Sequence, residues 1–163
     1  MINEKILLIG MPGCGKSTIG KVLANKLNYK FVDMDEYIEK MEGKSVSEIF
    51  KNGEDYFRNI ETDACRNLSK ENKIVIASGG GVVKKKVNME LFKDNFTIVF
   101  IDRPLDNIFG DVEVEKRPLL ANGKEVLYKL YNERYELYNL YCDYKIVNNK
   151  SLEKVIEDLL NIK

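Results

Sequence analysis

The residues best suited to chemistry lie near the N-terminus, where residues 10–17 read GMPGCGKS. This segment fits the pattern G-x-x-x-x-G-K-[ST], in which glycines let backbone N–H groups turn inward around phosphates. An apolar run precedes it and an amphipathic helix pattern follows, so the positive N-terminal end of that helix would face the phosphates. Lys16 would then reach the β- and γ-phosphates, and the Ser17 hydroxyl could coordinate magnesium. The segment predicts a site for a nucleoside triphosphate.

Cys14 lies inside this phosphate loop. We interpret it as a small filler residue; the alternative is a reactive thiol, because a helix N-terminus lowers a thiol pKa. The three cysteines are widely spaced and form no C-x-x-C pair, so neither a disulfide frame nor a zinc site is indicated. The chain has no histidine, which excludes Ser-His-Asp hydrolysis and histidine-bound metals.

Arginine is scarce in this chain, with only five among 26 basic residues. A guanidinium offers a rigid fork for a carboxylate or phosphate, so Arg58 and Arg134, on predicted helices, are candidates for binding an anion. A surface ion pair with Glu54 or Glu61 is an equal alternative for Arg58. The sequence alone leaves both interpretations open.

The elements that must position these residues alternate between strands and helices. We expect strands at 5–9, 29–32, 73–77, 96–101 and 144–147. We expect helices at 16–27, at 36–41, from Ser45, after Asn52-Gly53, at 125–140 and from Ser151. Near-continuous apolar strands in this alternation predict an α/β fold with a mainly parallel, covered sheet.

Several helical faces can be assigned from their periodicity. The inward positions expected are Phe57, Ile60, Ala64, Leu68, Leu127, Leu130, Tyr131, Tyr138, Val155, Ile156, Leu159 and Leu160. The lysine run 84–86 is interpreted as a solvated loop, with anion steering as the alternative. The charged segment at about 110–124 has weak periodicity and is interpreted as a mobile lid over the strand ends.

Composition limits the possible partners. A length of 163 residues fits one domain, 1–163, and the net charge of zero argues against a nucleic acid or an anionic membrane as partner. No apolar run approaches the roughly 20 residues of a membrane helix, and no signal-peptide pattern occurs, so we expect a cytoplasmic protein. No helix shows a surplus apolar face, which favours a monomer.

The kind of nucleotide enzyme can also be narrowed. A guanine-specific GTPase would carry N-K-x-D, whereas residues 149–152 read NKSL. A phosphate loop in so small a fold, with a lid, suits a kinase of small molecules, whose second substrate should bind at the carboxyl ends of neighbouring strands. The alternatives are a related kinase acting on gluconate or a nucleotide, and a non-catalytic nucleotide-binding regulator.

Taken in order, the motifs resemble those of the shikimate kinase family over nearly the whole chain. The matching pieces are the phosphate loop with Thr18, D-x-D at 33–35, F-R-x-I-E at 57–61, S-G-G-G at 78–81, R-P-L-L at 117–120 and R-x-x-x-Y at 134–138. The resemblance implies a nucleoside monophosphate kinase-like fold with a five-stranded parallel sheet in the order 2-3-1-4-5. It also implies ATP-dependent phosphorylation of the 3-hydroxyl of shikimate, toward chorismate and the aromatic amino acids.

The resemblance further implies a role for individual residues. ATP would contact Gly13, Cys14, Gly15, Lys16, Ser17, Thr18 and the lid residue Arg117. Shikimate would contact Asp35 through its reacting hydroxyl, Arg58 and Arg134 through its carboxylate, and the backbone of Gly79, Gly80 and Gly81. Mg²⁺ would be held by Ser17 and, through water, by Asp33. The substrate-binding helices would span about 34–62.

Two aspartates and one departure from the family pattern need separate treatment. Asp33 and Asp35 would face opposite ways if the strand continued, one toward metal and one toward substrate. Asp102 ends a run that resembles a Walker B strand, but we favour helix capping, because Pro104 suits the first turn of the next helix. Gly110 replaces an arginine that often stacks on adenine, so Phe109 or a residue around Lys150 is expected to cover the base.

Overall fold

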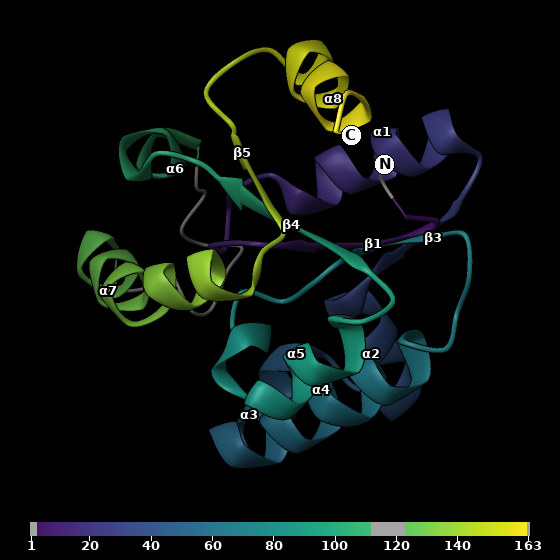
Figure 1. Ribbon diagram of the computed structural model, residues 1–163. Coiled ribbons are helices and arrows are strands. Elements are labelled where there is room, and N and C mark those ends of the chain that lie inside the picture. The colour runs from purple at the N-terminus through teal and green to yellow at the C-terminus, as the bar shows by residue number, and fades with distance from the viewer. Residues whose placement is uncertain (1–2, 112–122, 163) are drawn as a thin grey trace.

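The computed structural model describes residues 3–111 and 123–162. Within them, a five-stranded parallel sheet lies between two layers of helices (Figure 1). The strand order β2-β3-β1-β4-β5 confirms the order that the family resemblance implied. The strands are β1 (Lys5–Ile9), β2 (Lys30–Asp33), β3 (Ile74–Ala77), β4 (Thr97–Asp102) and β5 (Tyr144–Val147).

The helices cover both faces of the sheet. Helices α1 and α8 contact each other on one face, and α2, α3, α4, α5 and α7 lie on the opposite side (Figure 1). Their bounds are α1 (Lys16–Leu27), α2 (Met34–Glu42), α3 (Val46–Phe50), α4 (Glu54–Leu68), the 3₁₀ helix η1 (Val82–Lys84), α5 (Lys86–Phe92), α6 (Leu105–Asp111), α7 (Lys124–Tyr141) and α8 (Leu152–Leu160).

The three central strands form the middle of the core. All of β3 is buried, as are residues 6–9 of β1 and 97–101 of β4. Such apolar strands are typical of a parallel sheet that is covered on both faces. Strand β1 is central, because it pairs with β3 on one side and β4 on the other. The loop after Ile9 therefore lies in the middle of the row formed by the carboxyl ends of the strands.

Polar caps and one glycine fix the helix ends. The Ser45 hydroxyl accepts a hydrogen bond from the Glu48 amide at 3.2 Å, and the Ser151 hydroxyl accepts one from the Lys154 amide at 3.3 Å. Gly43 ends α2 in the left-handed region, at φ 67°, where a glycine carries no Cβ penalty. These contacts confirm the predicted starts of α3 and α8 and the predicted end of α2.

Three details differ from the expectations. Helix α5 begins at Lys86, within the run 84–86 that we had interpreted as a loop. With only seven residues, this helix is too short to leave a clear periodic signal in the sequence. Leu160, expected to be buried, is the last residue of α8 and is 43% exposed, and Tyr131 is only half-buried.

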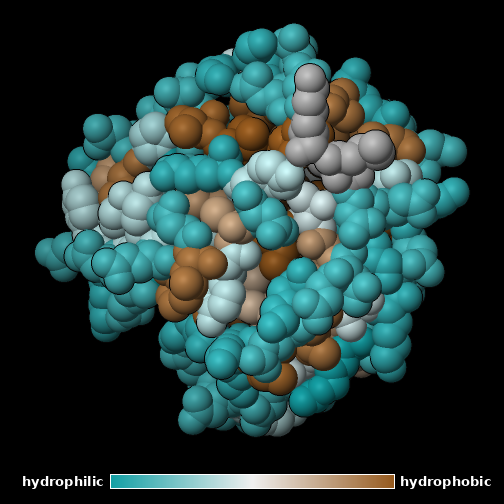
Figure 2. All heavy atoms as spheres, in the orientation of Figure 1, coloured by the Kyte–Doolittle hydropathy of each residue, from teal (hydrophilic) through white to brown (hydrophobic). Residues whose placement is uncertain are grey.

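The molecular surface in this orientation is mainly hydrophilic, with separate small apolar areas (Figure 2). Large hydrophobic side chains that are exposed among the described residues are Met41, Tyr56, Val87, Tyr128, Leu140, Val147 and Leu160. None of the helices in residues 3–111 and 123–162 is long and apolar enough to cross a membrane. The monomeric state stays a prediction.

Helix α8 offers a matched pair of substitutions that tests the burial pattern. Ile156 is 1% exposed and Leu160 43% exposed. Ile156→Ala should lower the free energy of unfolding by about 2–5 kcal/mol, because it leaves a cavity in the core. Leu160→Ala should lower it by less than about 1 kcal/mol. Urea unfolding of both variants measures this, and equal losses would contradict the packing of α8.

Candidate active site

The phosphate loop joins the end of β1 to the start of α1, as the motif predicts. Gly10, Gly13 and Gly15 have φ values of 149°, 80° and 98°, a region that other residues rarely adopt. A Cβ on Gly10 would also lie only 2.5 Å from the backbone oxygen of Ile101. The glycines are therefore required by the path of the loop, and substitution would distort it.

Lys16 is the first residue of α1, and its side chain reaches back into the phosphate loop. Its side chain is buried, and Nζ donates hydrogen bonds to the backbone oxygens of Gly10 at 2.7 Å and Met11 at 2.9 Å. These contacts hold the ammonium beside the positive end of α1, where phosphate oxygens would compete for its protons. The position agrees with the predicted role of Lys16 at the transferred phosphate.

Two side chains from distant segments hold the phosphate loop from outside. Asn148, which follows β5, donates from Nδ2 to the Cys14 oxygen at 2.8 Å, and Arg103, which follows β4, donates from Nη1 to the Gly13 oxygen at 3.1 Å. Holding these carbonyls outward leaves the N–H groups of the same loop free to turn inward. The sequence analysis missed both residues, because a single polar residue after a strand has no distinguishing pattern.

Cys14 itself is fully buried within the loop. A Cβ on Gly10 would lie only 2.8 Å from the Cys14 sulfur, so the Cys14 side chain fills the space that the glycine leaves. Burial of this thiol supports the filler interpretation over that of a reactive group, which needs exposure.

Asp33 and Asp35 were expected to face opposite ways only if the strand continued, and it does not, because the strand ends at Asp33 and Asp35 lies in α2. Asp33 caps this helix: its Oδ1 accepts hydrogen bonds from the amides of Asp35 at 3.0 Å and Glu36 at 3.2 Å. Its Oδ2 accepts a bond from the Ser17 hydroxyl at 2.5 Å. The cap turns both aspartates toward one cavity, with Asp33 beside the phosphate loop.

That cavity has a volume of about 620 Å³ and extends from the phosphate loop to α3. It is lined by loop residues, by both aspartates and by the segment 78–80. A smaller recess of about 40 Å³ lies beside it and shares part of its lining, including Asp35 and Gly80. Arg58, Glu61 and Arg134 line this recess. The predicted nucleotide residues and acceptor residues therefore line two adjacent cavities.

Arg58 lies on α4 and is only 6% exposed, so the alternative of a surface ion pair was wrong about its location. Both glutamates named for that alternative are nevertheless its partners. Nη1 is 2.9 Å from Glu61 Oε1, and Nε is 3.3 Å from Glu54 Oε1. The guanidinium carbon also lies 5.2 Å from the centroid of the Phe57 ring, within cation–π range.

Arg134 lies on α7 and is 3% exposed. Within the part of the chain that the structure describes, its Nε and Nη1 have no hydrogen-bond partner, and neither does Oε2 of Glu61. Buried N–H groups without an acceptor are costly, so these two nitrogens are available to bind an anion. A Cβ on Gly80 would lie 3.3 Å from Nη1, and the Tyr138 hydroxyl donates to the Gly80 oxygen at 2.5 Å, which fixes that backbone.

Glu61 is fully buried, whereas Asp35 keeps part of its surface exposed at the cavity. Loss of solvent around the carboxyl group still raises the pKa of Asp35, with the Asp33 charge acting in the same direction and the Lys16 charge opposing it. Burial also raises the pKa of Glu61, against the lowering effect of Arg58. Asp35 therefore holds its proton more firmly than an aspartate that is fully surrounded by water.

Other predicted residues lie elsewhere. The capping role favoured for Asp102 was wrong: its Oδ2 accepts a hydrogen bond from the Tyr135 hydroxyl at 3.2 Å and lies 3.3 Å from Lys145 Nζ. Helix α6 begins only at Leu105, beyond the reach of a cap by Asp102. Phe109 packs against the Tyr128 ring at a centroid distance of 5.4 Å. Arg117 and most of the predicted lid lie outside the described residues.

A phosphate loop at the centre of a parallel 2-3-1-4-5 sheet, open to a recess with two buried arginines, defines a P-loop kinase of a small molecule. The sequence matches the family model described as Shikimate kinase over residues 12–162, and the chain belongs to the shikimate kinase family.

Individual relatives agree with this membership. A shikimate kinase from Clostridium botulinum (strain Alaska E43 / Type E3) is 51% identical, over 99% of this chain and 98% of the relative. The solved shikimate kinase from Acinetobacter baumannii, in complex with shikimate, superposes with a TM-score of 0.91 at 32% identity, over 96% of this chain and 90% of that one. The Aquifex aeolicus enzyme gives 0.83 at 36% identity, over 96% and 94%.

The raised pKa of Asp35 predicts how stability depends on pH. An aspartate whose folded pKa exceeds its unfolded value of about 3.9 disfavours folding once pH rises through the folded pKa. Asp35→Asn cannot ionise, so it should increase the free energy of unfolding at pH 8, and the gain should shrink as pH falls toward about 4. Urea unfolding across this range tests it, with exposed Asp94→Asn as the control. A loss of stability at pH 8 would contradict the burial argument.

Proposed function

We propose that the cavity between the phosphate loop and helices α2 to α4 is where this shikimate kinase brings ATP and shikimate together. The family's reaction transfers the ATP γ-phosphate to a hydroxyl of shikimate, in aromatic amino acid biosynthesis. We assign the nucleotide to the end of the cavity beside the phosphate loop and shikimate, accepting at its 3-hydroxyl, to the end that adjoins the recess. The assignment of each residue below is part of this proposal.

The observation that carries the acceptor assignment is the buried guanidinium of Arg134 with two unpaired nitrogens among the described residues. A substrate carboxylate would supply the missing acceptors to both nitrogens. Arg58 lines the same recess and would contact the same carboxylate. Gly79, Gly80 and Gly81 leave room for Asp35, Pro12 and Arg58 respectively to pack close to this backbone, which shikimate would also contact.

In this proposal, Asp35 contacts the reacting hydroxyl of shikimate. It lies at the start of α2 and lines both the large cavity and the recess, so it can reach the acceptor while that substrate's carboxylate is held. Phosphoryl transfer passes through a loose transition state that needs positioning more than a strong base. Asp35 would therefore accept a hydrogen bond from the 3-hydroxyl and take its proton late.

The nucleotide would be held by the loop amides of Gly13, Cys14 and Gly15, by Lys16 and by the hydroxyls of Ser17 and Thr18. No cluster of three or more acidic, cysteine or histidine residues that could hold a metal occurs in the described ranges. Mg²⁺ fits this site all the same, because it commonly takes one or two protein oxygens and completes its shell with phosphates and water.

For that ion, Ser17 would supply a direct oxygen, and Asp33, whose Oδ2 lies 2.5 Å from the Ser17 hydroxyl, would act through water. When bound, Mg²⁺ neutralises charge on the β- and γ-phosphates. Lys16 and Arg117 would stabilise the charge that develops at the transferred phosphoryl group. Cytoplasmic location and a monomeric state stay predictions from the sequence.

The direct test is ADP release from magnesium-ATP with shikimate, gluconate or AMP as acceptor. We expect strong stimulation by shikimate and none by gluconate or AMP, because the family's reaction phosphorylates shikimate, and the two guanidinium groups suit a carboxylate, which AMP lacks. Turnover with another acceptor but not with shikimate would contradict the acceptor assignment while leaving the phosphate loop intact. An ATPase rate that shikimate does not change would favour a non-catalytic role.

Arg58→Lys tests the role of the guanidinium fork. A lysine keeps the charge but cannot form two parallel hydrogen bonds, so the KM for shikimate should rise about tenfold or more while the KM for ATP stays within about twofold. Steady-state kinetics with each substrate varied separately measures both constants. Arg66→Lys, on the exposed side of the same helix, is the matched control. An unchanged shikimate KM would mean that Arg58 serves only its ion pairs.

A further inference from the structure

The three consecutive lysines 84–86 have three different partners. Lys84 Nζ lies 2.5 Å from Glu54 Oε1, Lys85 Nζ donates to Asn59 Oδ1 at 2.7 Å, and Lys86 pairs with Glu90 on its own helix at 3.5 Å. Lys84 and Lys85 therefore both connect the segment after the three glycines to α4. The anion-steering alternative for this run loses support, because each lysine has a protein partner.

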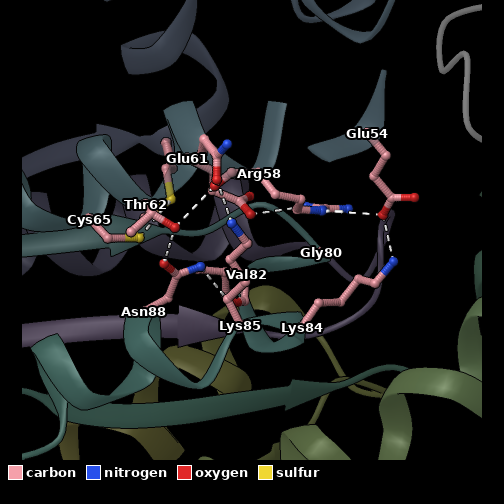
Figure 3. Close-up of polar contacts among 12 residues, drawn as sticks. Glu54, Arg58, Glu61, Thr62, Cys65, Gly80, Val82, Lys84, Lys85 and Asn88 are labelled. Carbon is pink, nitrogen blue, oxygen red and sulfur yellow. Dashed lines mark hydrogen bonds and ion pairs between the residues drawn. The ribbon is translucent and has the colours of Figure 1, made fainter. Parts of the chain in front are cut away.

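Lys84 differs from its neighbours because its partner also contacts Arg58. Glu54 Oε1 lies between Lys84 Nζ and Arg58 Nε, at 2.5 Å and 3.3 Å (Figure 3). On the far side, Arg58 Nη1 contacts Glu61 Oε1 at 2.9 Å. Four charged groups thus form a row from the half-exposed Lys84 to the fully buried Glu61. The Lys84 hydrogen bond is the main cause that lowers the pKa of Glu54, so that carboxylate stays charged.

We propose that Lys84 is a positioning residue for shikimate binding, which acts by holding the Glu54 carboxylate against Arg58. This inference rests on the proposed role of Arg58 in binding the substrate carboxylate. Lys84 itself contacts no substrate in the proposal. It adds a specificity device that the family motifs at 57–61 and 78–81 do not contain.

The geometry explains why Arg58 needs this support. The Glu54 side chain is 48% exposed, and its contact with Arg58 Nε is long. Without Lys84, the carboxylate gains little from staying in place, because an exposed ion pair hardly offsets the side-chain freedom it removes. Of the two ion pairs of Arg58 described above, only that with Glu61 would remain, and the guanidinium could rotate about that one contact.

A second effect acts in the same direction. The Lys84 ammonium offsets the negative charge of Glu54. This carboxylate contacts the Arg58 guanidinium, which would also bind the substrate carboxylate. Removing Lys84 takes one positive charge from the surroundings of the recess, which weakens the attraction of the recess for an anion wherever the Glu54 side chain then lies. Lys84 also belongs to η1, directly after the glycines 79–81, so its contact fixes the spacing between that backbone and α4.

The test compares Lys84→Met with Lys85→Met. Each substitution removes one contact between the segment after the glycines and α4. Only Lys84 contacts Glu54, which in turn contacts Arg58. Lys84→Met should raise the KM for shikimate about three- to fivefold, the size expected for a partly exposed pair, with kcat and the KM for ATP within about twofold. Lys85→Met should leave all three constants unchanged within about twofold, and Lys84→Arg should restore the shikimate KM.

A double-mutant cycle separates positioning from a general loss of order. In a Glu54→Gln background, Lys84→Met should add less than about twofold to the shikimate KM, because both act through one contact. Full additivity, or an equal effect of Lys85→Met, would overturn the proposal. If Arg58→Lys raises the shikimate KM and Lys84→Met does not, only this inference fails. If neither does, the assignment of Arg58 in the proposed function fails as well.

Discussion

The parallel pairing of β1 with β3 and β4 is the constraint on which the rest of the site depends. In a parallel sheet all carboxyl ends lie at one edge, so the phosphate loop after Ile9 and the glycines after Ala77 emerge side by side. Ser78 extends this alignment, since its amide and hydroxyl both donate to the Leu8 oxygen, at 3.1 Å and 2.8 Å. The glycines that follow line the recess, so a shift in the register of β1 and β3 would move the recess away from the phosphate loop.

The site concentrates buried charge at that edge. Arg58, Glu61 and Arg134 are all less than 7% exposed, and Asp35 has a pKa raised by burial. Some polar atoms of these groups have no hydrogen-bond partner in the described structure. Hydrophobic side chains in their place would make the protein more stable. Binding sites often sacrifice stability in this way, because groups satisfied in advance would have little to offer a ligand.

The sequence predicted the sheet and the phosphate loop well, because apolar strands and the spaced glycines leave strong local patterns. It predicted Arg58 as a binding residue only as one of two equal interpretations, since burial of a helical arginine depends on what packs over it. The opposite orientation of Asp33 and Asp35 depended on a strand that continued to Asp35, whereas Asp33 ends β2 and caps α2. From the sequence, Asp102 was assigned the wrong role and Asn148 was not indicated at all. The partners of both residues are distant in sequence, and no local pattern encodes such contacts.

The hydrogen bond from Asn148 to the Cys14 oxygen spans 134 positions of the chain. A growing chain therefore carries the phosphate-binding motif, residues 10–17, well before Asn148, which supplies this anchor, has been made. We therefore expect nucleotide affinity to require the fold of the chain through β5. Because a nucleotide would bind only that fold, it would stabilise the last strand and helix as well as the loop it touches. Early intermediates and chains that end before β5 would lack the anchor.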